Sequence, residues 1–192
     1  MAQPRPHALD IHQAHGRLHD LIVLDVRTPG EYATGHLPGA LNIPLDQLTR
    51  ALPDLREVAA RSDLLVVCAS GTRAENARAT LADNGITATT LTGGTGAWTD
   101  GGLALHHPDG NRRTTWTMER QVRFTAGAVV LSGLTLGRLR PAFRLASAGI
   151  AGGLVYSALT NTCGMAALLA KLPHNRPRQG DLEAALTALR SQ

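Results

Sequence analysis

The clearest chemistry in this sequence lies in a cysteine that is followed closely by an arginine. The segment spans residues 68–73, and its members are Cys68, Ala69, Ser70, Gly71, Thr72 and Arg73. A cysteine thiolate is a strong nucleophile, and the thiol becomes reactive where its surroundings favour the anion. We therefore predict that Cys68 is a catalytic nucleophile and that residues 69–73 form the loop that binds its substrate. The alternative for this cysteine is a buried packing residue.

The elements expected on either side of this segment favour the thiolate. Residues 64–67 form a short apolar run typical of a buried strand, and residues 74–82 have the pattern of a helix. Cys68 is therefore expected at the carboxyl end of a strand and at the start of a helix, where unpaired N–H groups stabilise negative charge. Gly71 allows the loop to turn several N–H groups toward one point, and Arg73 adds positive charge.

Strands and helices alternate through the first half of the chain. Short apolar runs predict strands at residues 21–24 and 64–67, and we predict two further brief strands at 41–44 and 87–91. Helices are predicted at 7–17, 45–61 and 74–82. Thr28 and Pro29 are a typical cap and first residue of a further short helix. This order predicts an α/β domain with a mainly parallel sheet flanked by helices. The site of such a sheet lies at the carboxyl ends of its strands, where Cys68 is expected.

Composition argues against several other classes of function. The net charge is +4, but the chain has no run of five like charges and few aromatic side chains, so no nucleic-acid partner is expected. Cys68 and Cys163 lie in different contexts, so we expect no disulfide, which fits a reducing compartment for Cys68. No cluster has the spacing of metal ligands, and neither a metal nor another bound cofactor is expected. The N-terminus lacks the apolar core of a signal peptide.

Beyond residue 105 the sequence changes character. Residues 106–115 are rich in turn formers, and we interpret them as a linker. Residues 124–137 and 145–170 contain no charged side chain, and the longer run is long enough to cross a bilayer. We predict an all-α hairpin of two membrane helices over residues 116–175, with a buried hairpin in a soluble domain as the alternative. Residues 176–192 form a tail in which Asp181 is expected to cap a short amphipathic helix.

Four motifs in the first part of the chain resemble those of the rhodanese domain family, in the same order and over residues 5–105. They are Asp25-Val26-Arg27 with Glu31-Tyr32, residues 35–44 (GHLPGALNIP), residues 68–73 (CASGTR), and residues 91–94 (LTGG) with Ala97-Trp98. The four motifs together are specific, although each alone is weak. The resemblance implies that residues 1–105 form a rhodanese-like sulfurtransferase domain.

The resemblance also implies a reaction, that of a thiosulfate sulfurtransferase. In that family the cysteine takes a sulfane sulfur from a donor such as thiosulfate and becomes a persulfide, which then passes its sulfur to a thiol or to cyanide. Cys68 would carry this persulfide, and the loop of residues 69–73 would hold the anionic sulfur with its N–H groups. No cofactor other than the covalent persulfide is implied.

Other functions use a similar cysteine. Related phosphatases and arsenate reductases have five residues between the cysteine and the arginine, whereas this loop has four, which favours a pocket of the size of a sulfur atom. A rhodanese domain that serves only for binding is disfavoured because the cysteine is present. The remaining alternative is a thiol-based redox or nitrosothiol sensor that uses the same activated Cys68 but turns over no persulfide.

Several other residues of these motifs are expected to shape the site rather than to react. Asp25 is expected to bind loop amides, and Arg27 is expected to pair with Glu31. His36 is expected to order the turn in which it lies. The glycines at 93–94 are expected to let the backbone approach closely.

The second part of the chain resembles the C-terminal membrane domain of YgaP-type rhodaneses. The resemblance rests on residues 116–123 (WTMERQVR), on the glycine-rich apolar runs, and on residues 160–166 (TNTCGMA) and 168–175 (LLAKLPHN). It implies a multi-pass anchor in the bacterial inner membrane, with the lipid bilayer as a partner and the catalytic domain facing the cytosol. It also implies a homodimer through glycine-rich helices. Gly133 with Gly137, and Gly149 with Gly153, have the spacing that lets helices approach closely in lipid.

The arginines bear on the expected orientation. Arg138, Arg140 and Arg144 fall at the turn of the predicted hairpin, which opposes the positive-inside rule. The flanking segments carry more cations, and we therefore expect both termini in the cytosol. These cations are Arg112, Arg113, Arg120, Arg123, Lys171, Arg176 and Arg178.

Cys163, near the end of the second apolar run, is expected to be a small packing residue. The alternative is a sulfur acceptor or redox partner of Cys68.

Overall fold

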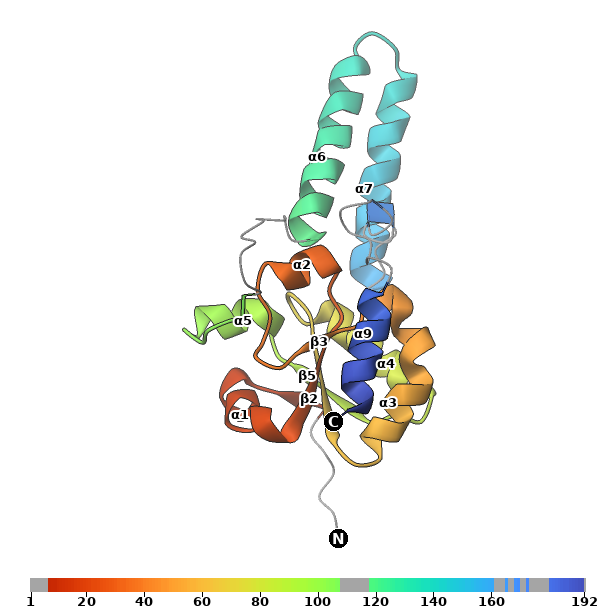
Figure 1. The fold of residues 1–192 in the computed structure, drawn as a ribbon. Helices are drawn as coiled ribbons and strands as arrows, with labels where there is room; N and C mark the ends of the chain where they lie inside the picture. The colour runs from red at the N-terminus through yellow and green to blue at the C-terminus, as the bar shows by residue number, and fades with distance from the viewer. Residues whose placement is uncertain are drawn as a thin grey trace. The chain divides into compact units, whose positions relative to one another are not determined.

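Five parallel strands form the sheet that organises the N-terminal part of the chain, in the order β1-β5-β4-β2-β3 (Figure 1). The strands are β1 (Ala8–Leu9), β2 (Leu21–Asp25), β3 (Leu41–Asn42), β4 (Asp63–Val67) and β5 (Ala88–Leu91). β4 lies at the centre, with β5 on one side and β2 on the other. Because the strands are parallel, their carboxyl ends meet at one edge, and the residue that follows β4 lies between the ends of its two neighbours.

The computed structural model describes residues 7–107, 118–160, 165, 168–169, 172 and 180–191. The chain divides into two units, one made of residues 1–115 together with 177–192, and the other of residues 116–176. The helices of the first unit are α1 (Ile11–Gly16), α2 (Pro29–Ala33), α3 (Leu52–Ala59), α4 (Thr72–Asp83), α5 (Gly94–Asp100) and α9 (Asp181–Arg190), with 3₁₀ turns η1 (Leu18–Asp20) and η2 (Leu45–Ala51). The second unit contains α6 (Met118–Leu136) and α7 (Ala142–Thr160).

Helices cover both faces of the sheet, because the strands are apolar on both sides. Leu24 and Val66 point to one face and pack with side chains of α3, α4 and α9. Val23 and Leu65, one position away along the same strands, point to the opposite face and pack with α1 and α5. The fold is therefore the expected parallel sheet flanked by helices (Figure 1).

Two of the predicted helices are wrong in their extent. Leu9 lies in β1, not in a helix over residues 7–17, because residues 8–9 pair with the edge strand β5; Asp10 then caps α1. The helix expected at 45–61 is a 3₁₀ turn followed by α3, which has a proline, Pro53, in its first turn. Proline lacks the N–H that a continuous helix needs in its interior but suits a helix start.

The C-terminal helix α9 is part of the first unit. Ala185, Leu186 and Leu189 are buried in the same cluster as α3 and the central strands, and Arg190 pairs with Asp54 of α3. The predicted amphipathic helix is thus present and its apolar face completes the domain core. Asp181 is its first helical residue and Gly180 takes the cap position, so the prediction that Asp181 is the cap is wrong by one residue.

The second unit is a hairpin in which α6 and α7 pack together. A side-chain carbon at Gly133 would lie 2.3 Å from Oγ of Ser147, and one at Gly137 would lie 2.5 Å from Cγ of Arg144. Gly133 of α6 and Gly137, which follows the helix, thus allow close contacts inside the hairpin. Gly149 and Gly153 of α7 border open space in the part of the chain that the structure describes. No described helix is both long enough and apolar enough to cross a membrane.

Candidate active site

Cys68 follows the last residue of the central strand β4 and lies beneath a short loop that leads into α4. The residue is only 1% exposed. Its Sγ accepts hydrogen bonds from two backbone N–H groups, Gly71 N at 3.1 Å and Ala74 N at 3.3 Å. Such aligned donors stabilise an anionic sulfur, because they offer partial positive charge without the mobility of water. The site therefore has the chemistry of a cysteine held ready as a nucleophile.

Gly71 allows the loop to turn its N–H groups toward the sulfur. Its φ is +104°, a conformation that side chains with a Cβ atom rarely adopt, and it is the residue that caps α4. Of the residues predicted to bind substrate, Gly71 supplies an N–H to the sulfur. Ser70 and Thr72 are exposed beside it, and Ala69 is half-buried. Ala74, which gives the second N–H, was not among the predicted site residues.

The start of α5 holds the base of the loop from the side of β5. Thr95 N donates to the Cys68 carbonyl at 2.8 Å, and Gly96 N donates to the Ala69 carbonyl at 3.0 Å. Gly94 has φ of +62°, and a side-chain carbon there would lie 2.2 Å from the Cys68 oxygen. The expected close backbone approach is confirmed at Gly94, where the approaching backbone is that of Cys68 and Ala69. A side-chain carbon at Gly93 would instead lie 2.6 Å from Cβ of Ala97.

Arg73 is not a free cation beside the thiol, because its charge is paired. Its guanidinium forms a two-pronged ion pair with Glu31 of α2, with Nη1–Oε2 at 2.8 Å and Nη2–Oε1 at 2.9 Å. The Glu31 side chain is 1% exposed and also accepts from the N–H and hydroxyl of Thr28. Burial alone would lower the pKa of Arg73, but its hydrogen bonds to Glu31 and the Glu31 charge more than offset this and raise it.

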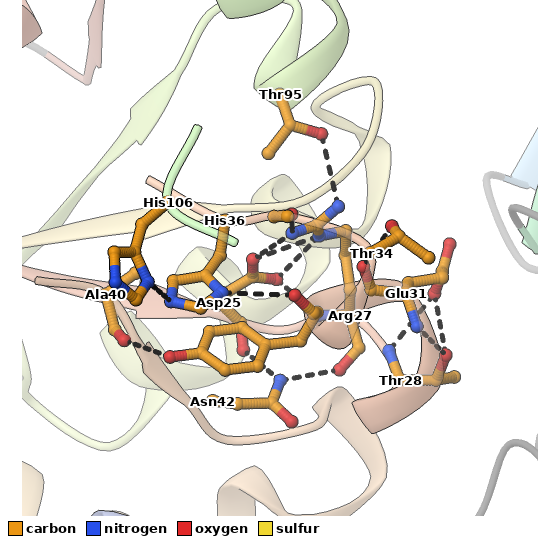
Figure 2. Close-up of polar contacts among 12 residues, drawn as sticks. Asp25, Arg27, Thr28, Glu31, Thr34, His36, Ala40, Asn42, Thr95 and His106 are labelled. Atoms are coloured by element: carbon orange, nitrogen blue, oxygen red, sulfur yellow. Dashed lines mark hydrogen bonds and ion pairs between the residues drawn. The ribbon is translucent and has the colours of Figure 1, made fainter. Parts of the chain in front are cut away.

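The expected pair of Arg27 and Glu31 is wrong, and Arg27 instead pairs with Asp25. Arg27 Nη2 lies 2.6 Å from Asp25 Oδ2, and both side chains are buried (Figure 2). The same guanidinium donates to the Gly35 carbonyl at 2.7 Å and reaches Thr95 Oγ1 at 3.5 Å. Asp25 also accepts from the Arg27 N–H, the local contact that was expected for it. This group joins the end of β2 to the start of α5, on either side of the cysteine.

His36 belongs to a second buried cluster next to the Asp25–Arg27 pair. Its ring stacks on Tyr32 with centroids 3.7 Å apart. Its Nε2 lies 3.2 Å from Nδ1 of His106 (Figure 2). Burial lowers the pKa of His36 and raises the pKa of Tyr32 to about 12. The Tyr32 hydroxyl donates to the Ala40 carbonyl at 2.6 Å. His36 thus orders its turn, as expected, and also ties residue 106 to the domain.

Two further expectations concern other groups. Cys163 lies outside the described residues. Among the residues that the structure does describe, no group of three or more His, Cys, Asp or Glu side chains is placed to hold a metal ion.

Glu31 is the site residue whose partner was predicted wrongly from the sequence, since it pairs with Arg73 and not with Arg27. The segment from Thr28 to Glu31 carries a capping-box pattern, which places a glutamate at the start of a helix but does not reveal its distant partner. Arg73 is 42 positions away in the sequence, and only the fold brings the two together.

Comparison with known proteins agrees with this geometry. Residues 8–100 match the family described as rhodanese-like domain, and residues 117–178 match the transmembrane domain of inner membrane protein YgaP-like proteins. An uncharacterized protein of Synechocystis is 34% identical over 81% of this chain and 85% of its own length. A sulfurtransferase of Allochromatium vinosum is 34% identical over 47% of this chain and 83% of its own length.

Among solved structures, a rhodanese-related protein from Thermoplasma volcanium shares the fold. It has a TM-score of 0.50 and 24% identity, and the match covers 54% of this chain and all of that one. The chain therefore belongs to the rhodanese-like proteins, and it consists of a single rhodanese-like domain followed by a YgaP-like transmembrane domain.

Proposed function

We propose that this protein is a membrane-anchored sulfurtransferase that carries sulfane sulfur as a persulfide on Cys68. The observation that carries the proposal is the pair of N–H groups, from Gly71 and Ala74, at the cysteine sulfur. These donors stabilise the Cys68 thiolate, which attacks the sulfur donor in the first step and is the leaving group in the second. Membership of the rhodanese-like family and the likeness to a sulfurtransferase support sulfur transfer in general.

The proposed cycle has two displacements at sulfur. In the first, the Cys68 thiolate attacks the outer sulfur of thiosulfate, an Sγ–S bond forms, and the S–S bond of the donor breaks. Its electron pair leaves with sulfite, and Cys68 becomes a persulfide anion. In the second, a thiolate or cyanide attacks the terminal sulfur, and the electron pair of the Sγ–S bond returns to Cys68. The cycle needs no general base once the thiolate is formed.

The geometry favours this chemistry over phosphoryl transfer. The N–H groups of Gly71 and Ala74 lie within hydrogen-bond distance of Sγ itself, and the Arg73 guanidinium is bound to Glu31. A phosphate would need several free donors and an available cation at the mouth of the loop. A singly charged sulfur group is smaller than a phosphate and needs fewer hydrogen-bond donors from the loop.

We further propose that the hairpin anchors the protein in the bacterial inner membrane, with the catalytic domain in the cytosol. The match to an inner-membrane transmembrane domain supports this. So do the many large apolar side chains exposed on the hairpin, which include Phe124, Leu131, Leu134, Leu145, Val155 and Leu159. If two copies pair in the bilayer, Gly149 and Gly153 have room for a second helix and the spacing that helix pairs use.

The packing of α9 on the first unit supports an even number of membrane crossings by the hairpin. Residues 1–115 and 177–192 belong to one unit, and Leu186 and Leu189 complete its core. The hairpin therefore leaves this unit and returns to it. Both ends of a membrane segment within residues 116–176 would lie in the compartment of the catalytic domain.

Turnover by the detergent-solubilised full-length protein tests the proposed activity. Wild-type protein should form thiocyanate from thiosulfate and cyanide, and Cys68→Ser should lose this activity entirely. Folded wild-type protein that alkylates at Cys68 but forms no thiocyanate would reject thiosulfate as a donor, and would favour a thiol sensor instead.

A further inference from the structure

The buried carboxylate of Glu31 lies where it cancels the one cation of the cysteine loop. Arg73 is the loop's only charged residue, and both arms of its guanidinium are held by Glu31. Thr28 gives the carboxylate two further hydrogen bonds, so that it is fixed in place from its own helix. The pair is therefore built as a unit and is not a chance surface contact.

A cation this close to Cys68 would otherwise act on whatever binds at the sulfur. Arg73 directly precedes Ala74, whose N–H lies 3.3 Å from Sγ, so Arg73 belongs to the short loop around the sulfur. The Cys68 charge also contributes to raising the pKa of Arg73. The other buried guanidinium of the site, Arg27, is bound in the same way by Asp25. Each of these two arginines thus has its own buried carboxylate.

We propose that Glu31 determines specificity by withholding the Arg73 charge from the sulfur donor, so that the site prefers singly charged sulfane donors to dianions. This inference rests on the proposed sulfur transfer and names its donor class. An organic persulfide or a thiosulfonate carries a single negative charge, which the two N–H groups at Sγ can accommodate. Thiosulfate carries two, and the site offers it no uncompensated cation from Arg73.

The test compares thiosulfate with methanethiosulfonate, a singly charged donor with the same kind of sulfane sulfur. The quantity to measure is the ratio of kcat/KM for thiosulfate to kcat/KM for methanethiosulfonate in full-length protein. Glu31→Gln leaves a net positive charge at Arg73, and the ratio should rise about tenfold, which corresponds to about 1.4 kcal/mol of added attraction. This gain should shrink as salt is added.

Two further variants separate charge from structure. Arg73→Gln removes the positive charge and keeps the Glu31 carboxylate, and the ratio should fall below that of the wild type. The double variant Glu31→Gln with Arg73→Gln is neutral again, and its ratio should return to the wild-type value. A purely structural role would change both donors alike and leave the ratio constant in all three variants. That constancy in folded protein would overturn the proposal, and Arg73→Gln suffices for the test if Glu31→Gln does not fold.

Glu75→Gln is the matched control. Glu75 lies on helix α4, is exposed, and pairs with Arg78 rather than with Arg73. Its replacement removes the same formal charge, and the donor ratio should stay at the wild-type value. A rise equal to that in Glu31→Gln would mean that the overall charge of the domain, and not the buried pair, sets the preference.

Alkylation of Cys68 tests the same inference without sulfur transfer. In a Cys163→Ser background, the rate ratio of iodoacetate to iodoacetamide reports the charge near Sγ. It should rise about tenfold in Glu31→Gln and fall in Arg73→Gln. If these ratios change as stated while no donor turns over, charge compensation stands and the proposed activity fails. If the donors turn over and both ratios stay fixed, the activity stands and the inference fails.

Discussion

At the cysteine, the expected backbone N–H groups are present, but the charge that Arg73 was expected to add is paired with Glu31. The reactivity of such a site depends on the path of the loop more than on any side chain in it. Glycines that fix this path should therefore be as important as the residues that touch substrate.

Gly94→Ala tests this dependence. The added carbon would lie 2.2 Å from the Cys68 carbonyl oxygen, at a positive φ of +62°. The substitution should cost about 2–4 kcal/mol of folding free energy, because either the loop or α5 must shift. Chemical denaturation should show this loss, and thiocyanate formation should fall in the protein that remains folded.

Gly16→Ala is the control for Gly94→Ala. Gly16 ends α1, and no atom lies within 4 Å of the carbon that alanine would add. Stability and turnover should remain near the wild-type values. A Gly94→Ala protein as stable and active as Gly16→Ala would show that the close approach of α5 does not hold the loop.

The buried His36 should make the domain sensitive to acid. Burial lowers the pKa of His36 below its ordinary value of 6.5, so the unfolded chain takes up the proton more readily than the folded domain. His36 therefore favours folding above that ordinary value, and stability falls as the pH drops through it toward the lowered pKa. Unfolding measured between about pH 5 and 8 should show this slope.

His36→Gln should flatten that part of the profile, and His12→Gln, which replaces an exposed histidine of α1, should not. An unchanged slope in His36→Gln would assign the acid sensitivity to other groups.

At the residue scale, the sequence predicts which residues form the site but not which of them pair with each other. The prediction of Cys68 at a strand end, on a loop with Gly71, matches the structure because adjacent residues determine it. The partners of Arg27 and Glu31 were wrong, because Arg73 approaches Glu31 from 42 positions away. Local spacing favours a near pair, and only the strand order places α2 beside the start of α4.

At the scale of elements, α9 is the addition that completes the catalytic domain. Leu189 is fully buried among side chains of the sheet and α3. Leu189→Ala should therefore lower the free energy of unfolding of this domain by about 2–5 kcal/mol. The measurement is denaturant unfolding of the full-length protein, followed by a signal from the catalytic domain.

Thr187→Ala changes an exposed position of the same helix and should leave stability within about 0.5 kcal/mol of the wild type. Equal effects of the two substitutions would mean that α9 does not pack on the domain in solution.

The elements of the domain were easier to predict than their boundaries. Apolar runs identified β2 and β4, because buried parallel strands are nearly continuous in apolar residues. The shorter β3 and β5 were also predicted, although their residues are not continuously apolar. The two-residue β1 was missed, since a strand this short has no periodicity and owes its existence to pairing with β5. The amphipathic pattern predicted α9 as a helix, but a pattern of local spacing cannot name the surface that the helix covers.

At the scale of the whole molecule, the division into units has a consequence for topology. Residues on both sides of the hairpin belong to the catalytic unit. In a Cys68→Ser, Cys163→Ser background, Asp10→Cys and Ser191→Cys should therefore react with an impermeant maleimide from the same side of the membrane. Leu139→Cys, at a turn residue that is 80% exposed, should react from the opposite side.

Labelling of residues 10 and 191 from opposite sides would contradict the packing of α9 on the domain. Labelling of all three from one side would keep that packing but reject a hairpin that crosses the bilayer.

The central claim is that Cys68 carries the transferred sulfur, and the mass of the intact protein tests it most directly. Full-length protein treated with thiosulfate and freed of donor should gain the mass of one sulfur atom, and cyanide should remove it as thiocyanate. Cys68→Ser should gain nothing. A folded wild-type protein that stays unmodified both with thiosulfate and with methanethiosulfonate, or a Cys68→Ser protein that gains the same sulfur, would contradict the account.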